Sequence, residues 1–92
     1  MFDLVYATKF KKDVKRCQKR NWNLDELKKV IDVLRIPQRL EKKYCPHSLD
    51  GIYADYQECH IKPDWLLIYR YNNDDNVLYL YRTGTHSELF GM

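Results

Sequence analysis

The sequence predicts an α+β fold with the element order β-α-α-β-β-β. Apolar residues recur with helical spacing before Pro37, and short runs rich in Tyr, Leu, Ile and Val follow Gly51. A run of Asn and Asp residues between two of these strand candidates marks a hairpin turn. With 92 residues the chain can form one compact domain but not two, so we expect a single domain over residues 1–92. The expected architecture is a helical hairpin packed on a small, twisted, mainly antiparallel sheet.

The chain is expected to begin with a short strand and a basic amphipathic helix. Residues 2–6 form the strand candidate, and the Thr8 hydroxyl is positioned to cap a helix that runs to about Arg20. Phe10, Val14 and Cys17 share one face of this helix, while most of its other positions are Lys or Arg. One stripe therefore packs inward, and the remaining surface is strongly cationic.

A second helix is predicted over residues 24–34. Its apolar stripe consists of Leu27, Val30, Ile31 and Leu34. Asn23 is the expected N-cap, with Glu26 three residues later. Pro37 ends the helix, because proline lacks an amide hydrogen and disfavours helix in the residue before it.

The second half of the chain predicts an antiparallel meander. The polar stretch over residues 38–51 contains Pro46 and Gly51 and is expected to be a long loop. Three strands are predicted after it, over residues 53–61, 65–71 and 77–82. The Asn and Asp residues at 72–76 form the turn between the last two strands. The tail from Thr83 is expected to form a turn against the sheet without another regular element.

The composition points to a cytoplasmic protein. No stretch approaches the roughly 20 apolar residues of a membrane span, and the first residues lack the pattern of a signal peptide. The three cysteines, Cys17, Cys45 and Cys59, show no framework spacing and are expected to be reduced.

The charge is unevenly divided along the chain. The residues up to Pro46 hold 13 lysines and arginines against 6 acids, whereas the residues from His47 onward hold 3 against 7. Solvated faces of two amphipathic helices would explain the basic half. Attraction to phosphate backbones is the more specific alternative, because lysine and arginine release counterions there.

The residues suited to chemistry lie in the second half. His47, His60 and His86 sit in a loop, at a strand end and in the tail, while Asp64 and Arg82 lie nearby in sequence. RNA cleavage by internal attack needs a base, an acid and positive charge, which imidazole, carboxylate and guanidinium supply without a metal or cofactor. Trp65 and Phe90 are candidates for stacking on exposed bases.

Ordinary structural roles stay open for the same residues. A histidine in a loop is usually solvated, and Trp65 precedes three apolar residues in a way that fits the core. Phe90 can anchor the tail, and Arg82 can pair with an acid such as Glu58. Cys45, His47, Cys59 and His60 are potential metal ligands, but their spacing does not match a zinc site, so no metal is expected.

Three segments of the chain resemble the RelE superfamily of bacterial toxins, closest to its YafQ branch. They are the motifs HSLDG at 47–51, ECHIKPDWLLIY at 58–69 and RTGTHSELF at 82–90. The resemblance implies a ribosome-dependent mRNA interferase, an endoribonuclease that cleaves mRNA in the ribosomal A site without a metal. The implied active site consists of His47, His60, Asp64, Trp65, Arg82, His86 and Phe90.

The resemblance also implies roles and partners. We expect His86 to be the general acid, His60 or Asp64 the base, Arg82 the phosphate clamp and His47 an orienting residue, with Trp65 and Phe90 contacting mRNA. The implied partner is a cognate antitoxin of the ribbon-helix-helix type, similar to DinJ or RelB. The toxin is expected to contact operator DNA only indirectly, through this antitoxin. The basic first helix fits docking on ribosomal RNA. A non-catalytic RNA-binding or ribosome-binding module is the alternative reading.

Overall fold

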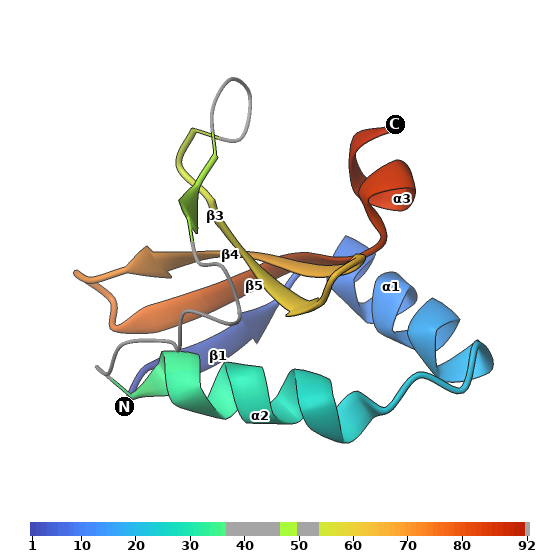
Figure 1. Cartoon of the computed structure of the whole chain (residues 1–92). Helices are drawn as coiled ribbons and strands as arrows, with labels where there is room; N and C mark the ends of the chain where they lie inside the picture. The colour runs from blue at the N-terminus through green and yellow to red at the C-terminus, as the bar shows by residue number, and fades with distance from the viewer. Residues whose placement is uncertain (37–46, 50–53, 92) are drawn as a thin grey trace.

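The computed structural model describes residues 1–36, 47–49 and 54–91. Within these ranges the elements follow the order β1, α1, α2, β2, β3, β4, β5 and α3 (Figure 1). The predicted α+β class and its helical hairpin on a mainly antiparallel sheet are confirmed. Two short elements, β2 and α3, were not predicted. No helix among the described residues is long and apolar enough to cross a membrane.

The sheet has the strand order β1-β5-β4-β3-β2. Its centre is the predicted meander of β3 (Gln57–Lys62), β4 (Trp65–Asn72) and β5 (Val77–Gly84), paired antiparallel. β1 (Asp3–Tyr6) adds to β5 in parallel. β2 (His47–Ser48) pairs with β3, so the prediction of an unbroken loop over residues 38–51 was wrong at its end.

Helix α1 (Thr8–Lys19) and helix α2 (Leu24–Arg35) lie on the same side of the sheet (Figure 1). The predicted cap of α2 is confirmed, because the Asn23 side chain accepts a hydrogen bond from the Asp25 amide. The predicted cap of α1 was wrong, because Ala7 is the N-cap residue and no side chain caps it. The Ala7 amide still donates to the Leu80 carbonyl, so the chain passes from strand pairing directly into the helix at Thr8.

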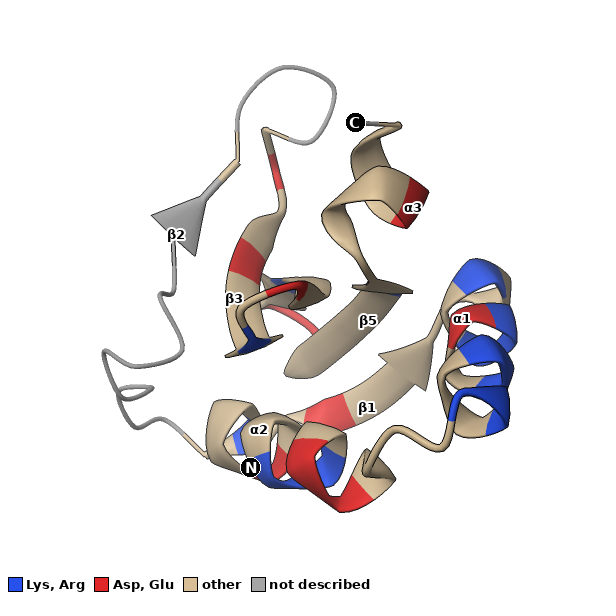
Figure 2. Ribbon diagram, turned by 45° about the vertical axis from the view of Figure 1, so that its right-hand side comes forward, with Lys and Arg blue, Asp and Glu red and all other residues tan. Residues whose placement is uncertain are grey.

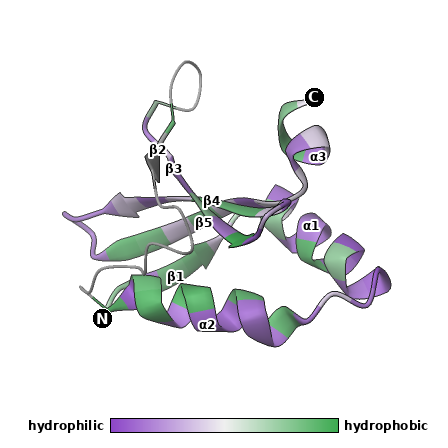
Figure 3. Ribbon diagram, in the orientation of Figure 1, coloured by the Kyte–Doolittle hydropathy of each residue, from purple (hydrophilic) through white to green (hydrophobic). Residues whose placement is uncertain are grey.

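The main core fills the space between the two helices and the sheet. Every second strand residue points into it, among them Cys59, Leu67 and Leu80, each 0% exposed. The apolar stripe of α2 turns toward the sheet and its polar side faces outward (Figure 3). We call this side of the sheet the covered face. Burial raises the pKa of the Cys17 thiol to about 11 and that of the Cys59 thiol to about 12, so both thiols stay protonated.

The opposite side of the sheet, which we call the site face, is covered in part by α3 (His86–Phe90). The prediction of an irregular tail was wrong here. The Thr85 side chain accepts from the Glu88 amide and the Glu88 side chain accepts from the Thr85 amide, a capping box that starts the helix. Gly91, with φ of 71°, ends it in a left-handed conformation. Leu89 of this helix packs on Leu66 and Ile68 in a second, smaller cluster.

Candidate catalytic site

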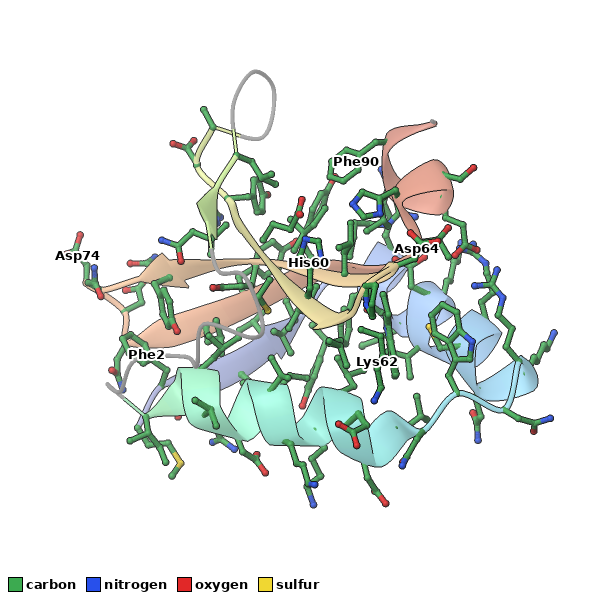
Figure 4. The ribbon with its side chains drawn as sticks, viewed as in Figure 1. Phe2, His60, Lys62, Asp64, Asp74 and Phe90 are labelled. Atoms are coloured by element: carbon green, nitrogen blue, oxygen red, sulfur yellow. The ribbon has the colours of Figure 1, made fainter. Side chains whose placement is uncertain are left out.

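Strand alternation places two polar residues of β3 on the site face. Cys59 and Ile61 point into the core, so Glu58 and His60 point the other way. Their cross-strand partners on β4 are Ile68 and Leu66, both 0% exposed, so the site face is apolar next to them. We call these two residues the apolar floor of the site. Figure 4 shows His60 on this face of the sheet, below Phe90 of α3. The strand pattern therefore sets a carboxylate and an imidazole side by side on an apolar base.

Glu58, His60 and His86 form a tight cluster on this floor. His60 Nε2 lies 3.1 Å from Glu58 Oε1, and Glu58 is 4% exposed. The rings of His60 and His86 meet edge to face, with their centroids 5.6 Å apart. One nitrogen or oxygen ligand atom from each of the three residues lies within 4.8 Å of the others. The cluster brings together two imidazoles and one buried carboxylate.

His86 is held by Asp64, which lies in the turn between β3 and β4. Asp64 Oδ1 accepts from the His86 backbone amide at 3.0 Å and lies 2.7 Å from His86 Nδ1. These hydrogen bonds, the backbone one first, lower the pKa of the Asp64 carboxyl below its usual value. The carboxylate therefore fixes both the first turn of α3 and the orientation of the imidazole. Because His86 Nδ1 contacts Asp64, Nε2 is the nitrogen of this ring that could exchange a proton with a substrate.

Helix α3 is also tied to α1 through Glu88. The Glu88 carboxylate accepts from both Nη atoms of Arg20, with Nη1 at 2.8 Å, and from Arg16 at 3.0 Å. The Arg20 hydrogen bond is the main reason that the pKa of Glu88 falls to about 2. Glu88 Oε1 also accepts from the Thr85 amide at 3.1 Å and so completes the capping box. Helix α3, which carries His86, is thus anchored at its first turn from two directions.

Arg82 reaches the site face through a bulge in β5. Tyr69 pairs with Leu80 and Ile68 pairs with Arg82, so Tyr81 is an extra residue that shifts Arg82 to the face of Ile68. Its Nε and Nη2 donate to Asp13 of α1 at 2.7 and 3.1 Å. Asp13 is 1% exposed and also accepts from the Thr83 amide at 3.2 Å, where β5 has passed the end of its partner β1. A buried carboxylate therefore fixes the arginine and caps the strand edge together.

The structure brings together some of the predicted site residues and separates another. His60, Asp64 and His86 meet, Arg82 shares their face, and Phe90 packs partly buried beside Leu66 and Ile68. Trp65 is on the covered face, 3% exposed, with its Nε1 donating to Thr83 at 2.9 Å. This position gives Trp65 a role in the core, and its expected contact with mRNA stays a prediction. The ordinary reading, in which Arg82 pairs with an acid, is confirmed, and the acid is Asp13.

His47 enters the site through its backbone position. In the antiparallel register of β2 and β3, it lies opposite Glu58. The side chain of His47 lies outside the described part of the chain, as does Cys45 with the loop before it.

Two carboxylates of the site did not stand out in the sequence. Asp13 stands within the buried stripe of Phe10 and Cys17 at helical spacing, in a helix whose exposed residues are mostly basic. An acid at a stripe position is the signal that could have revealed it. Glu58 stands two residues before His60, so strand alternation alone puts both on one face.

The chain is similar throughout its length to known bacterial toxins. The family of bacterial toxins of type II toxin-antitoxin systems, YafQ, matches residues 2–91. The mRNA interferase toxin YafQ of Escherichia coli K12 is 39% identical over 92 residues, which cover 97% of this chain and 96% of the relative.

Two solved structures share the fold and cover nearly all of both chains. The E. coli DinJ-YafQ complex matches with a TM-score of 0.89 and 37% identity, over 99% of this chain and 100% of the other. A metal-bound toxin from Helicobacter pylori matches with a TM-score of 0.93 and 43% identity, over 98% and 100%. The protein whose histidine cluster is described above therefore belongs to the YafQ family of type II toxin-antitoxin toxins.

Proposed function

We propose that this protein is the toxin of a type II toxin-antitoxin pair and acts as an mRNA interferase, an endoribonuclease that cuts mRNA in the ribosomal A site. Its E. coli relative carries the name mRNA interferase toxin, and the likeness extends over nearly the whole of both chains. The observation that carries the proposal is the pairing of His86 with Asp64 at 2.7 Å beside the ring of His60. Two imidazoles in one place can supply both proton transfers that RNA cleavage needs.

The proposed reaction is internal attack of a ribose 2′-oxygen on the adjacent phosphorus. The new oxygen–phosphorus bond forms as the bond to the 5′-oxygen breaks, leaving a 2′,3′-cyclic phosphate and a 5′-hydroxyl. One proton leaves the 2′-hydroxyl and one reaches the 5′-oxygen, so the reaction needs no oxidant and no outside nucleophile. A metal ion is not required for either transfer.

His60 is assigned as the base and His86 as the acid. Asp64 is the weaker candidate for the base, because its pKa is lowered and its Oδ1 already accepts from His86. Buried Glu58 lies 3.1 Å from His60 Nε2 and so orients the His60 ring. Asp64 orients His86 in the same manner. Each imidazole therefore has a carboxylate partner of its own.

Arg82 is assigned to the negative charge that builds on the phosphoryl oxygens. A guanidinium fits phosphate oxygens with a planar set of donors, and Asp13 holds this one by two hydrogen bonds. His47, opposite Glu58 in the sheet, is assigned an orienting role. Phe90 on α3 is assigned to stack on a base of the mRNA. These assignments support cleavage over the non-catalytic module, which would need basic and aromatic residues but no paired histidines.

The partners follow from the family and from charge. A neighbouring structure is the complex of DinJ with YafQ, which supports a cognate antitoxin for this chain. We assign it to the ribbon-helix-helix type, with operator DNA reached only through it. The outward side of α1 is dense in lysine and arginine (Figure 2), which suits docking on ribosomal RNA in the cytoplasm.

The direct test adds the purified protein to a cell-free translation reaction and maps mRNA 5′ ends by primer extension. We expect cuts at codons in the A site, with 5′-hydroxyl ends, and none in the same mRNA without ribosomes over the same time. Intact mRNA on translating ribosomes would contradict the enzyme assignment. Cutting by a His60→Ala, His86→Ala double variant at the wild-type rate would contradict the assignment of the two proton transfers to these histidines.

One observation favours metal binding as a second property of the same cluster. The ligand atoms of Glu58, His60 and His86 are close enough together to share one transition-metal ion, and a toxin 43% identical was crystallised with a metal. Such an ion would occupy the imidazoles that transfer protons, so it should inhibit cleavage. We expect one equivalent of Zn²⁺ to inhibit and a chelator to restore activity, with ribosome integrity controlled. Stimulation by Zn²⁺ would instead contradict the metal-free mechanism.

A further inference from the structure

We propose that a pocket beside the catalytic cluster binds one nucleobase of the RNA, next to the phosphate that is cut. The inference rests on the proposed ribonuclease function and gives that site a second, base-recognising part. The pocket has a volume of about 430 Å³ and lies between the α1–α2 connection, the β3–β4 turn and the start of α3. Its lining residues are Asn21, Trp22, Asn23, Lys62, Asp64, Trp65 and Thr85.

Two indole rings give the pocket an aromatic wall. The centroids of Trp22 and Trp65 are 4.8 Å apart, with the planes tilted by 47°. Trp65 is locked in the core by its hydrogen bond to Thr83, while Trp22 is only half-buried. The Arg20 guanidinium also lies over the Trp22 ring, 5.1 Å from its centroid, so a base would stack on the part of the ring that Trp65 and Arg20 leave exposed. Any base can stack on such a surface, because every base has a π-face.

Two asparagine side chains lie next to this aromatic wall and can form hydrogen bonds with the edge of a base. Asn21 and Asn23 flank Trp22, and both are exposed. Asn21 has a φ of 61°, a left-handed conformation that asparagine tolerates better than most residues and that sets the course of the connection. The Asn21 amide offers donors and an acceptor to the edge of a base, whereas Asn23, whose Oδ1 caps α2, offers donors.

The charges around the pocket favour a nucleotide over an apolar side chain of a protein. Lys62 on its rim is exposed, and the guanidinium of Arg20 lies over the Trp22 ring at 5.1 Å from the centroid. Lysines and arginines of α1 continue this basic surface (Figure 2). A base stacked on Trp22 would bring its own phosphates within reach of these cations.

Asp64 joins the pocket to the catalytic cluster. It lines the pocket, and its Oδ1 holds the imidazole and the backbone amide of His86. Figure 4 shows Asp64 close to the base of α3, with Lys62 at the same end of the sheet. A nucleotide in the pocket would therefore be a direct neighbour of the phosphate at His86. This position suits a subsite that selects which codon is cut.

The first test uses the two indole N–H signals of the ¹⁵N-labelled protein, because the chain has only two tryptophans. Each of the four nucleoside 5′-monophosphates is titrated separately. We expect the Trp22 signal to shift saturably with at least one of them, and less with ribose 5-phosphate. No shift, or an equal shift with ribose 5-phosphate, overturns the base site. A shift of Trp22 that only an antitoxin produces assigns the pocket to a protein and also overturns it.

The second test measures cleavage on translating ribosomes with variants of the pocket. Lys62→Ala should raise KM roughly threefold to tenfold with kcat nearly unchanged, whereas Lys29→Ala, an exposed lysine of α2, should change neither. Trp22→Phe should alter the ranking of cut codons, and unchanged backbone amide signals in parts of the sheet away from residue 22 would show that its fold is intact. An unchanged ranking in a folded variant overturns the pocket but leaves the ribonuclease assignment standing. Nucleotide binding by a protein that cuts no mRNA would do the reverse.

Discussion

Neighbouring residues of one strand point to the covered face and to the site face of the sheet, and the two faces differ in burial and in polarity. On the covered face, Cys59 and Leu67 are completely buried under α1 and α2. On the site face, Glu58 and His60, their immediate neighbours on β3, form a polar cluster with His86. Because side chains alternate along a strand, the packing of Cys59 in the core fixes the positions of Glu58 and His60 on the other face.

The largest expected effect comes from the site face. His86→Ala and His60→Ala should each reduce cleavage roughly 10²- to 10⁴-fold, because each removes one proton transfer. The free energy of unfolding should change little for His86→Ala, whose side chain is partly exposed, and should fall by about 1–3 kcal/mol for His60→Ala, which takes this partner from the buried Glu58 carboxylate. Cleavage rates on ribosomes and urea denaturation check the two halves of this prediction.

The matched control is Ser87→Ala, an exposed position on the same helix turn as His86. It should keep both stability and activity. Unfolding of the histidine variants at the growth temperature, with Ser87→Ala folded, would make the histidines structural and would remove the distinction between the faces.

The next effect comes from the covered face. Leu67→Ala should lower the free energy of unfolding by about 2–5 kcal/mol, through lost burial and the cavity it leaves. At a temperature where the variant is still folded, its cleavage rate should match the wild type. Val5→Ala, at an exposed position of β1, is the control and should cost much less. A loss of cleavage by folded Leu67→Ala would show that the core tunes the chemistry itself.

Asp13 connects the covered face with the site face, because it is buried on the inner side of α1 and accepts a hydrogen bond from the Arg82 guanidinium. Asp13→Asn should cost about 1–3 kcal/mol of stability, the range for a buried polar group that loses its partner. It should also lower kcat with KM nearly constant, because Arg82 acts on charge that develops during the reaction.

Asp32→Asn, on the exposed side of α2, serves as the control for Asp13→Asn and should change neither quantity. A rise in KM alone for Asp13→Asn would assign Arg82 to substrate binding and not to stabilisation of the transition state.

The smallest effect concerns the anchor of α3. The pKa of Glu88 is lowered from 4.5 to about 2 in the folded protein, so its stabilisation is complete above about pH 4.5 and is lost as the pH falls through about 2. Glu88→Gln should therefore lower Tm near neutral pH, by about 4–8 °C for each kcal/mol lost. The difference in Tm from wild type should shrink as the pH falls below 4.5. A difference that stays constant down to pH 2 would mean that the carboxylate charge does not hold the helix.

Elements with a strong period were predictable from the sequence, and those set by distant contacts were not. The α2 stripe, the Asn23 cap and the meander follow from local spacing and turn chemistry. β2 has two residues and exists because it pairs with β3, so no local pattern marks it. Helix α3 is short, yet Thr85 and Glu88 stand at capping-box spacing, a signal that was present in the sequence.

The candidate site divides in the same way. The positions of His60, Asp64 and His86 near one another were expected, and the structure brings them together. The burial of Trp65 and the pairing of Arg82 with Asp13 depend on how α1 and the bulge in β5 pack, which spacing along the chain does not encode. The same limit explains why the pocket beside Trp22 became visible only in three dimensions.

The most direct measurement of the central claim is the single-turnover cleavage rate on ribosomes programmed with a defined mRNA. Wild type, His86→Ala and Leu67→Ala are compared at a temperature where all three are folded. Wild type and Leu67→Ala should cleave at similar rates, whereas the rate of His86→Ala should be lower by roughly 10²-fold or more. Equal rates for wild type and His86→Ala would contradict the central claim, because the chemistry would then not reside in the histidine cluster of the site face.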